Sequence, residues 1–342
     1  MGINFFSTNF NAPSKSLSIV VPVLNEADGI AALLPDLSQV LNAIGYPWEI
    51  VVVDDGSSDH LEDVLAQFSS EHPDANLQLL RLSRNFGKEC ALTAGLEAAR
   101  GEAVICMDGD GQHPPEVIRK MVECWESGKE MVVGIQDRRR VERSSLIRIK
   151  SLFYRYLQSD ERFNIPANGG DFRLMDRKVV NALLRLPERT RFMKGLYAWL
   201  GFRTELISFE PNVRTKGESK FMLRQLFDLA LTGITAFSMR PLRLVARIGL
   251  AMSGLAMLYG SYIVCDTLIF GNEQSGWATL AAGMMLLSGI QLVCLGVIAE
   301  YLGRVFEECK RRPLYIVAQS TDRSCLSLPQ HGLEERFATA TS

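Results

Sequence analysis

Short apolar runs alternate with amphipathic stretches in the first half of the chain. The runs Leu17–Val23, Trp48–Val53, Leu77–Leu82 and Val104–Met107 are rich in Val, Ile and Leu, which predicts buried strands. Between them we expect helices from about Gly29 to Ile44 and from about Glu89 to Ala99, and Ser57 and Ser58 as caps of a further helix. This alternation predicts an α/β fold with a mostly parallel sheet and helices on both faces.

The apolar residues are distributed differently after position 240. Ile248–Cys265 contains 18 uncharged residues and extends across Asp266 to Phe270, and Trp277–Ala299 contains 23 uncharged residues. A helix rises about 1.5 Å per residue, so the second stretch exceeds the roughly 30 Å of a bilayer core. We expect two transmembrane helices, at about 248–270 and 277–299, the alternative being a buried hairpin of a soluble protein.

Basic residues flank these two stretches on one side only. They are absent from residues 271–276, which join the stretches, and they gather at the outer ends, at Arg240, Arg243, Arg247, Arg304, Lys310, Arg311 and Arg312. The positive-inside rule therefore predicts a multi-pass protein of the bacterial inner membrane, with the α/β domain and both termini in the cytoplasm.

Composition narrows the class of protein further. The net charge is -2, which gives no reason to expect a nucleic acid partner. The seven cysteines contain no Cys-x-x-Cys pair, which favours a reducing compartment over a zinc site or a disulfide framework. Residues 1–16 lack the features of a signal peptide.

The strand at Val104–Met107 ends in a group of hard oxygen ligands. Asp108 and Asp110, together with the amide of Gln112, suit Mg²⁺ or Mn²⁺, which share their coordination shell with substrate phosphates. The simpler alternative is a polar turn. Neither Gly-x-Gly-x-x-Gly nor a phosphate-cradling Gly-Lys-Ser loop occurs, which disfavours dinucleotide oxidoreductases and nucleotide triphosphatases.

Four motifs together resemble family 2 glycosyltransferases of the GT-A fold: Val21–Glu26, Val53–Ser57, Asn85–Lys88 and Asp108–Gln112. The resemblance implies an inverting enzyme that uses a nucleotide sugar, with the metal at Asp108, Asp110 and Gln112 and with Asp110 taking part in catalysis. It also implies a nucleotide-binding set, which comprises Pro22, Asn25, Glu26, Asp54, Asp55, Ser57, Asn85, Lys88, Asp108 and Gly109.

Later segments resemble the polyprenyl-phosphate branch of this family, above all bactoprenol glucosyltransferases, with a more distant likeness to dolichol-phosphate mannose synthases. They are Asn168–Met175, Leu186–Gly195, Arg214–Phe221 and Glu300–Val317, although Ala299 and Gln136 replace a usual glycine and a frequent arginine. The branch implies a lipid phosphate acceptor, with Asp171 on the acceptor side as the candidate catalytic base or orienting group. The acceptor phosphate is expected to bind Arg138, Arg139, Arg143, Arg214, Ser219 and Lys220.

The sequence therefore predicts a membrane enzyme that transfers one hexose, with UDP-glucose favoured as donor, to undecaprenyl or another polyprenyl phosphate. Transfer of N-acetylglucosamine, galactose or mannose, a processive synthase and a catalytically silent scaffold are the alternatives. The expected segments are 1–16, a GT-A domain at 17–220, an interfacial helix at 221–240, a hairpin at 244–303, a juxtamembrane segment at 304–317 and a disordered tail at 318–342. The small residues from Gly283 to Gly296 would allow self-association, and the oligomeric state stays open.

Overall fold

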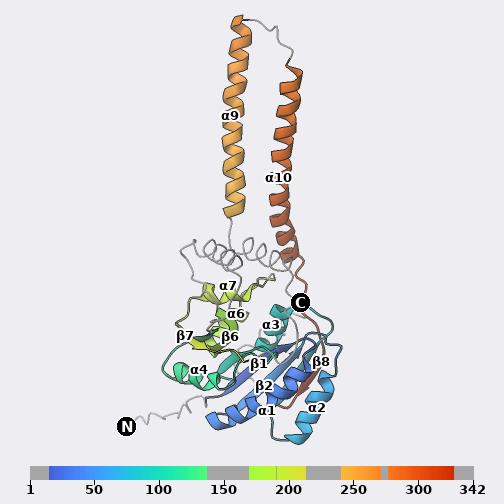
Figure 1. Ribbon diagram of the computed structural model, residues 1–342, viewed down its shortest axis with the longest axis vertical. Helices are drawn as coiled ribbons and strands as arrows, with labels where there is room; N and C mark the ends of the chain where they lie inside the picture. Colours follow the sequence, from blue (N-terminus) through green and yellow to red (C-terminus); the bar gives the residue numbers. More distant parts are fainter. Residues whose placement is uncertain (1–14, 137–168, 190, 213–239, 271–275, 327–342) are drawn as a thin grey trace, which may run out of the picture. The chain divides into compact units, whose positions relative to one another are not determined.

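The computed structural model describes residues 15–136, 169–189, 191–212, 240–270 and 276–326. The chain divides into two compact units (Figure 1). The α/β unit comprises residues 1–187, 191–220 and 313–342, and the helical unit comprises residues 188–190 and 221–312. The α/β unit is thus built from segments on both sides of the two long helices.

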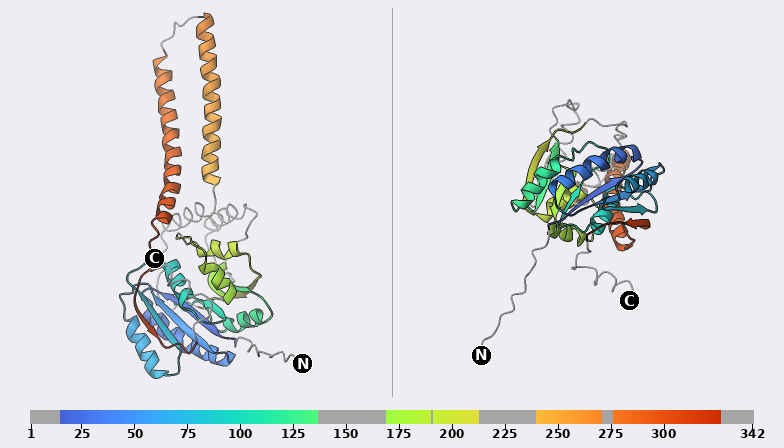
Figure 2. Two further views of the ribbon diagram at one scale, coloured as in Figure 1. Left: turned by 180° about the vertical axis from the view of Figure 1, so that it is seen from behind. Right: turned by 90° about the horizontal axis from the view of Figure 1, so that it is seen from below.

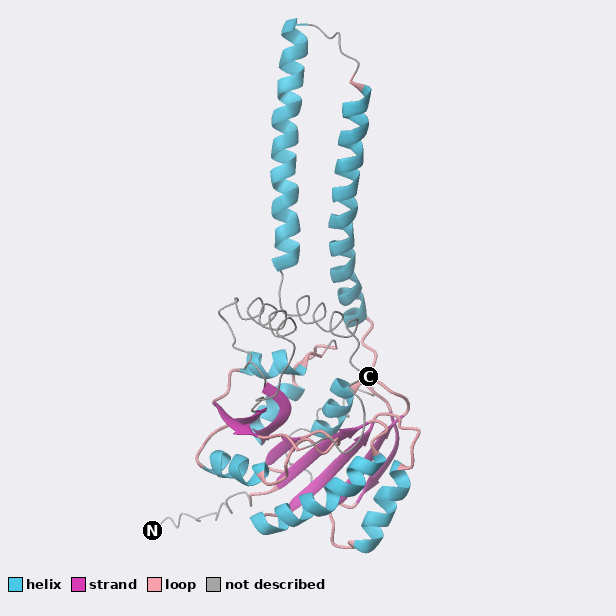
Figure 3. Cartoon of the chain, in the orientation of Figure 1, coloured by secondary structure: helices cyan, strands magenta, loops and turns pink. Residues whose placement is uncertain are grey.

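Among the described residues, eight strands form one sheet (Figure 3). In spatial order the strands are β7 (Thr204–Phe209), β5 (Met131–Gln136), β6 (Gly169–Asp176), β4 (Ala103–Cys106), β1 (Leu17–Val23), β2 (Trp48–Asp54), β3 (Leu77–Leu82) and β8 (Val317–Asp322). Pairing is parallel among β1, β2, β3 and β4 and between β5 and β7, whereas β6 and β8 run antiparallel to their neighbours. The predicted mostly parallel sheet and its four predicted strands are confirmed.

Helices cover both faces of this sheet (Figure 2). On one face α1 (Ala27–Ile44), α2 (Leu61–Glu71) and α4 (Val117–Glu126) share a core with alternate strand residues, among them Ile19, Val21 and Val52. The other face carries α3 (Lys88–Ala98), with α6 (Arg177–Leu184) and α7 (Met193–Leu200) beside it. A Cβ on Gly95 would lie 2.3 Å from Val20 Cγ1, so α3 packs closely on the intervening strand residues.

The start of α2 differs from the prediction. Its N-cap residue is His60, and no side chain caps it, so Ser57 and Ser58 are not its caps. Ser57 has another role, because its hydroxyl accepts the Asn25 N–H at 2.9 Å and its own N–H donates to Asp54 at 2.7 Å. Ser58 donates to the side-chain oxygen of Asn25. The two serines therefore connect the loops that follow β1 and β2.

The first part of the predicted disordered tail is ordered. Val317–Asp322 forms β8, which pairs antiparallel with β3 from Gln78↔Asp322 to Leu82↔Val317. This segment has no hydrophobic periodicity, so its order comes from backbone hydrogen bonds to β3. These bonds also cover the edge of β3. Residues 327–342 lie outside the described residues.

The residues after β8 complete a buried polar network. The Glu49 side chain is fully buried, and it accepts hydrogen bonds from Ser18 Oγ at 2.5 Å, Gln78 Nε2 at 2.8 Å and the Arg100 N–H at 2.6 Å. Ser324 Oγ supplies a further donor. A buried carboxylate needs such donors, since an unpaired one is strongly destabilising.

Ser324→Ala is expected to lower the free energy of unfolding by roughly 1–3 kcal/mol, because a charged acceptor loses one donor. Ser320→Ala, at an exposed position on β8, should change it by less than about 0.5 kcal/mol. Chemical denaturation of the purified full chain measures both. Equal stability of the two variants would contradict a structural role for Ser324.

Two long helices make up the described part of the helical unit. They are α9 (Arg240–Phe270) and α10 (Trp277–Cys309), and each contains a window long and apolar enough to cross a membrane, Leu244–Ile263 and Leu286–Cys309. Both windows are unburied within the protein. The helix α10 extends past the predicted end at 299, where an ion pair of 3.2 Å between Arg304 and Glu300, one turn apart, supports it.

Candidate active site at the carboxyl edge of the sheet

Lys88 joins two acids, Asp108 in the loop after β4 and Asp171 in β6. Its Nζ lies 2.7 Å from Asp108 Oδ1 and 2.8 Å from Asp171 Oδ2. The acids meet because β4 and β6 are antiparallel with Cys106 opposite Arg173, and two further residues bring Asp108 opposite Asp171. Lys88 is the first residue of α3, in the connection that follows β3. The structure thus brings together three of the predicted site residues at the carboxyl ends of the parallel strands.

Charge at this centre decides what Asp171 can do. Burial by itself would raise the pKa of Asp171, but Lys88, followed by Lys194 and Arg173, holds the pKa at about 2. Burial by itself would lower the pKa of Lys88, but the negative charges of Asp108 and Asp171 raise that pKa above its usual value. Asp171 is therefore an ion-paired carboxylate at neutral pH and a weak proton acceptor.

The loop after β4 is held by His113. Its Nδ1 accepts the Asp108 N–H at 3.0 Å, so a neutral ring carries its proton on Nε2. Burial lowers the pKa of His113, which keeps the ring neutral, and the ring stacks on Phe172 at 4.6 Å. The sequence interpretation did not assign His113, although it directly follows the acidic motif. This histidine fixes the backbone from which Asp108 and Asp110 project.

The donor set of this loop fits a hard divalent cation. Asp108 and Asp110 are carboxylates two residues apart, and Asp110 Oδ1 accepts the Gln112 N–H at 3.1 Å, which bends the loop. Among the described residues no group of three or more His, Cys, Asp or Glu side chains could hold a metal ion. Two protein carboxylates suit Mg²⁺ or Mn²⁺, which complete their shells with water and phosphate, and do not suit a fully enclosed structural metal.

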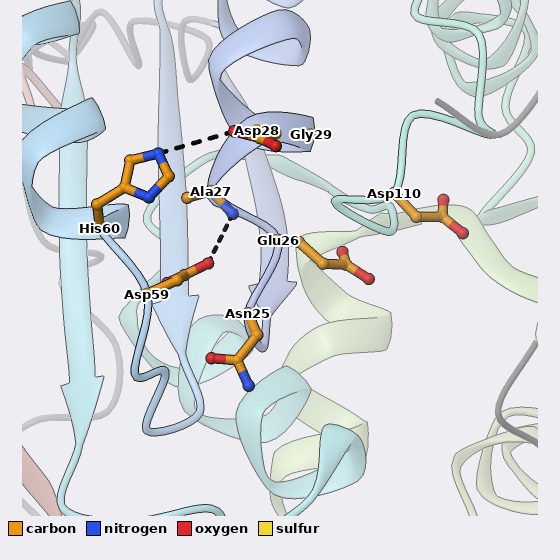
Figure 4. Close-up of a pocket in the computed structure, with 8 residues that line it drawn as sticks. All are labelled: Asn25, Glu26, Ala27, Asp28, Gly29, Asp59, His60 and Asp110. Carbon is orange, nitrogen blue, oxygen red and sulfur yellow. Dashed lines mark hydrogen bonds and ion pairs between the residues drawn. The ribbon is translucent and has the colours of Figure 1, made fainter. Parts of the chain in front are cut away.

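The first turn of α1 lies against the same loop. A Cβ on Gly29 would come within 2.6 Å of the Gly109 carbonyl oxygen, so only glycine fits there. Beside this contact is a cavity of about 420 Å³, lined by Asn25, Glu26, Asp28, Asp59, His60 and Asp110 among others (Figure 4). The Ala27 N–H donates to Asp59 at 2.9 Å. Asn25, Glu26 and Asp110, all predicted site residues, thus line one cavity.

The predicted nucleotide-binding acids Asp54 and Asp55 are bonded within the protein. Asp54 Oδ2 lies 3.4 Å from Arg81 Nε. Asp55 Oδ1 accepts the Phe86 N–H at 2.7 Å, and its Oδ2 accepts the Gly87 N–H at 2.9 Å. Burial raises the pKa of Asp55, while these two N–H groups oppose that rise. Asp55 therefore positions the loop that carries Asn85 and Lys88, and nucleotide contact by either acid stays a prediction.

Asp55→Ala is expected to lower the free energy of unfolding by roughly 2–4 kcal/mol, because two backbone donors of a buried carboxylate lose their acceptor. Catalytic rate should fall as well, since Lys88 directly follows the released loop. Asp63→Ala, an exposed acid on α2, is the matched control. Denaturation curves of both variants measure the effect, and an Asp55→Ala protein as stable as the control would contradict the role of Asp55 as a loop anchor.

A further carboxyl group that the sequence interpretation did not assign belongs to Glu89, which follows Lys88 on α3 and has a buried Oε2. Burial and then the charge of Asp171 raise the pKa of Glu89 to about 7, and the Met193 N–H, at the start of α7, donates to Glu89. The guanidinium of Arg173 lies 3.5 Å above the ring of Tyr197 and donates to the Gly170 carbonyl at 2.6 Å. No sequence periodicity brings α3, β6 and α7 together, so only the tertiary fold reveals these groups.

Several predicted residues cannot be placed in this site. Pro22 is buried within β1, and Asn85 is exposed on the loop before α3. The predicted acceptor residues lie outside the described residues, and so do residues 221–239 of the interfacial helix predicted at 221–240. Asn168 and residues 271–275 between the long helices lie outside them as well. The acceptor residues concerned are Arg138, Arg139, Arg143, Arg214, Ser219 and Lys220.

Two stretches of the chain match known protein families. Residues 18–184 match Glycosyl transferase family 2, and residues 240–305 match the GtrB C-terminal hairpin. The chain is 43% identical over 303 residues to an uncharacterized glycosyltransferase of Synechocystis sp., covering 88% of this chain and 94% of that protein. It is 40% identical over 304 residues to the bactoprenol glucosyl transferase of Shigella phage SfII, covering 89% of this chain and 98% of that protein.

Among solved structures, the comparison found glucosyl-3-phosphoglycerate synthase from Mycobacterium tuberculosis in complex with Mn²⁺, uridine-diphosphate and glucosyl-3-phosphoglycerate. It has a TM-score of 0.44 and 18% identity, over 65% of this chain and 78% of that one.

Proposed function

Because the chain belongs to glycosyl transferase family 2 and is a glycosyltransferase, we propose that it transfers glucose from UDP-glucose to a polyprenyl phosphate. The single observation that carries this proposal is the pairing of Asp108 and Asp171 with one lysine, Lys88, at the carboxyl edge of the sheet. The acceptor and the sugar are proposed from the names of relatives, among them the bactoprenol glucosyl transferase of Shigella phage SfII.

The donor is proposed to bind between the first turn of α1 and the loop after β4. Asn25, Glu26 and Gly29 line the cavity there, and Gly29 also packs closely against the Gly109 carbonyl. Asp108 and Asp110, with Gln112, would hold a divalent cation, either Mg²⁺ or Mn²⁺. When bound, that cation neutralises charge on the diphosphate that departs.

The acceptor phosphate acts as the nucleophile in this proposal. A phosphate monoester has a second pKa near 6, as phosphoserine does, so at neutral pH it is largely dianionic and needs little help from a base. The properties of Asp171 agree with this, because Lys88 holds its pKa at about 2. The Asp171 carboxylate is therefore better suited to orienting a group than to accepting a proton. A phosphate oxygen bonds to the anomeric carbon as the bond to the nucleotide diphosphate breaks, which inverts the configuration of that carbon.

The membrane placement is part of the same proposal. The two apolar windows in α9 and α10 would cross the inner membrane, which keeps a polyprenyl chain within reach of the enzyme. Basic residues at the outer helix ends, such as Arg247 and Lys310, favour a cytoplasmic α/β unit. The acceptor phosphate set in residues 138–143 and 214–220 stays a prediction from sequence.

A donor panel tests the proposal. Purified full chain in detergent receives undecaprenyl phosphate, Mg²⁺ or Mn²⁺, and UDP-glucose, UDP-N-acetylglucosamine, UDP-galactose or GDP-mannose in separate reactions. We expect a single lipid-linked sugar, formed fastest from UDP-glucose, and none after addition of a chelator. Faster product formation from another donor would overturn the assignment of glucose, and metal-independent turnover would overturn the role of the cation.

A further inference from the structure

The chain returns to the α/β unit directly after α10. The helix ends at Cys309, Arg311 adopts a left-handed conformation with a φ of 48°, and Pro313 is again part of the α/β unit. A left-handed residue with a proline soon after it is a common end of a helix, so the chain leaves α10 at a defined point. Residues 313–326, the return segment, are therefore the covalent link from the second long helix to the sheet.

The backbone of the return segment holds the start of the loop that leads to α3. Leu82, at the end of β3, pairs with Val317, and the Ser83 N–H donates to the Ile316 carbonyl at 2.9 Å. Ser83 is the first residue after β3, in the connection that ends at Lys88. The return segment thus helps to set the point at which this connection leaves the sheet.

Two side-chain contacts of the return segment hold the other end of α3. The Tyr315 hydroxyl donates to Glu97 Oε2 at 2.6 Å, in the last turn of the helix. Just after the helix, the Arg100 guanidinium donates to the Leu326 carbonyl at 3.0 Å and forms an ion pair with Asp322. Hydrogen bonds that involve a charged group are stronger than neutral ones. The return segment therefore contacts the β3–α3 connection and the far end of α3.

These contacts matter for the site because α3 begins at Lys88. Glu97 lies about two and a half turns further along the same helix. The N-cap residue is Gly87, which has no side chain to cap the helix, so the position of Lys88 depends on what holds α3 as a whole. A short packed helix shifts as one body, and a misplacement of about 1 Å in an active site can be costly.

We propose that Tyr315 is a positioning residue, through which the return segment fixes α3 and thereby keeps Lys88 against Asp108 and Asp171. The proposal rests on the proposed function for its effect on turnover, and it assigns Tyr315 no contact with substrate. Because the return segment continues from α10, the position of Lys88 is linked through it to a helix that carries an apolar window of membrane length.

Hydrogen–deuterium exchange of the full chain in detergent tests the positioning without any need for turnover. Tyr315→Phe keeps the ring and removes the hydroxyl, so backbone amides in residues 83–98 should exchange about three- to tenfold faster, as expected for one lost hydrogen bond. Ser320→Ala, at an exposed position on β8, should leave their exchange unchanged. Unchanged exchange in Tyr315→Phe, or equal acceleration throughout the α/β unit, would overturn the proposal.

A double-mutant cycle with Lys88→Met tests whether Tyr315 acts through Lys88. Tyr315→Phe should lower kcat for sugar transfer about three- to tenfold and change KM for the donor less than about twofold. In the Lys88→Met background the same substitution should have no further effect, because the group that it positions is already absent. Equal losses in both backgrounds would overturn the link to Lys88. If the wild type makes no lipid product with any donor, the proposed function fails, and the exchange experiment still decides whether Tyr315 holds α3.

Discussion

Asp110→Ala is expected to lower the rate of sugar transfer roughly 100-fold or more, because Asp110 would help hold the divalent cation that stabilises the negative charge developing on the departing diphosphate. Asp110 lines the cavity at the first turn of α1, and the bent loop that carries it is anchored through His113. Loss of its two oxygens leaves Asp108 as the only carboxylate of the Asp-x-Asp motif. The affinity of UDP should then lose its dependence on Mn²⁺, since the cation links protein to diphosphate.

The matched control is Asp36→Ala, which removes an exposed carboxylate from α1 without touching the cavity. Its transfer rate should equal that of the wild type. Calorimetric titration of UDP with and without Mn²⁺ separates a binding effect from a folding effect, because a misfolded variant loses both titrations. Wild-type rates in Asp110→Ala would exclude this loop as the cation site.

Lys88→Met is expected to lower the rate by a similar factor, roughly 100-fold, because the site loses the lysine ammonium group that neutralises Asp108 and Asp171. Lys88 Nζ contacts both acids at less than 3 Å, and its side chain is 44% exposed, so the loss should fall on turnover more than on stability. Without Lys88 the pKa of Asp171 should rise above about 2. Lys88→Arg keeps the charge but changes its shape, so it should restore only part of the rate.

A double-mutant cycle with Asp171→Asn isolates this interaction. Two residues that act through one ion pair show strongly non-additive effects, so the double variant should be little slower than the slower single variant. Denaturation curves of all three variants provide the folding control. Strictly additive losses would mean that Lys88 and Asp171 act independently, contrary to the geometry of this site.

The sequence predicted the elements whose signals are local. Strands β1 to β4 are short runs rich in Val, Ile and Leu, and acids or amides follow several of them. The fold class then predicted that these polar residues meet at one edge of the sheet. The two long helices were predicted because each contains a long stretch without charged residues. By contrast, β8 contains no hydrophobic alternation, and its order comes from backbone pairing with β3, which a sequence pattern does not encode.

The site was predictable only in part for the same reason. Asp108 and Lys88 were identified from motifs, yet the ion pair that joins them to Asp171 depends on the antiparallel register of β4 and β6. In the sequence, Glu89 is a charged residue next to Lys88 on a predicted helix, and nothing in the pattern distinguishes it from other charged residues. Its character comes from burial against α7 and from the neighbouring Asp171, both of which are tertiary effects.

The most direct test of the account is the identity of the group that accepts the sugar. Purified full chain with Mn²⁺ and radiolabelled UDP-glucose is given undecaprenyl phosphate or, in a parallel reaction, undecaprenol, which has the same lipid without the phosphate. The account predicts one glucose per lipid with the phosphate present, joined through a phosphate oxygen, and none with the alcohol. Equal labelling of the alcohol, or label only in free glucose or a polymer, would contradict transfer to a lipid phosphate.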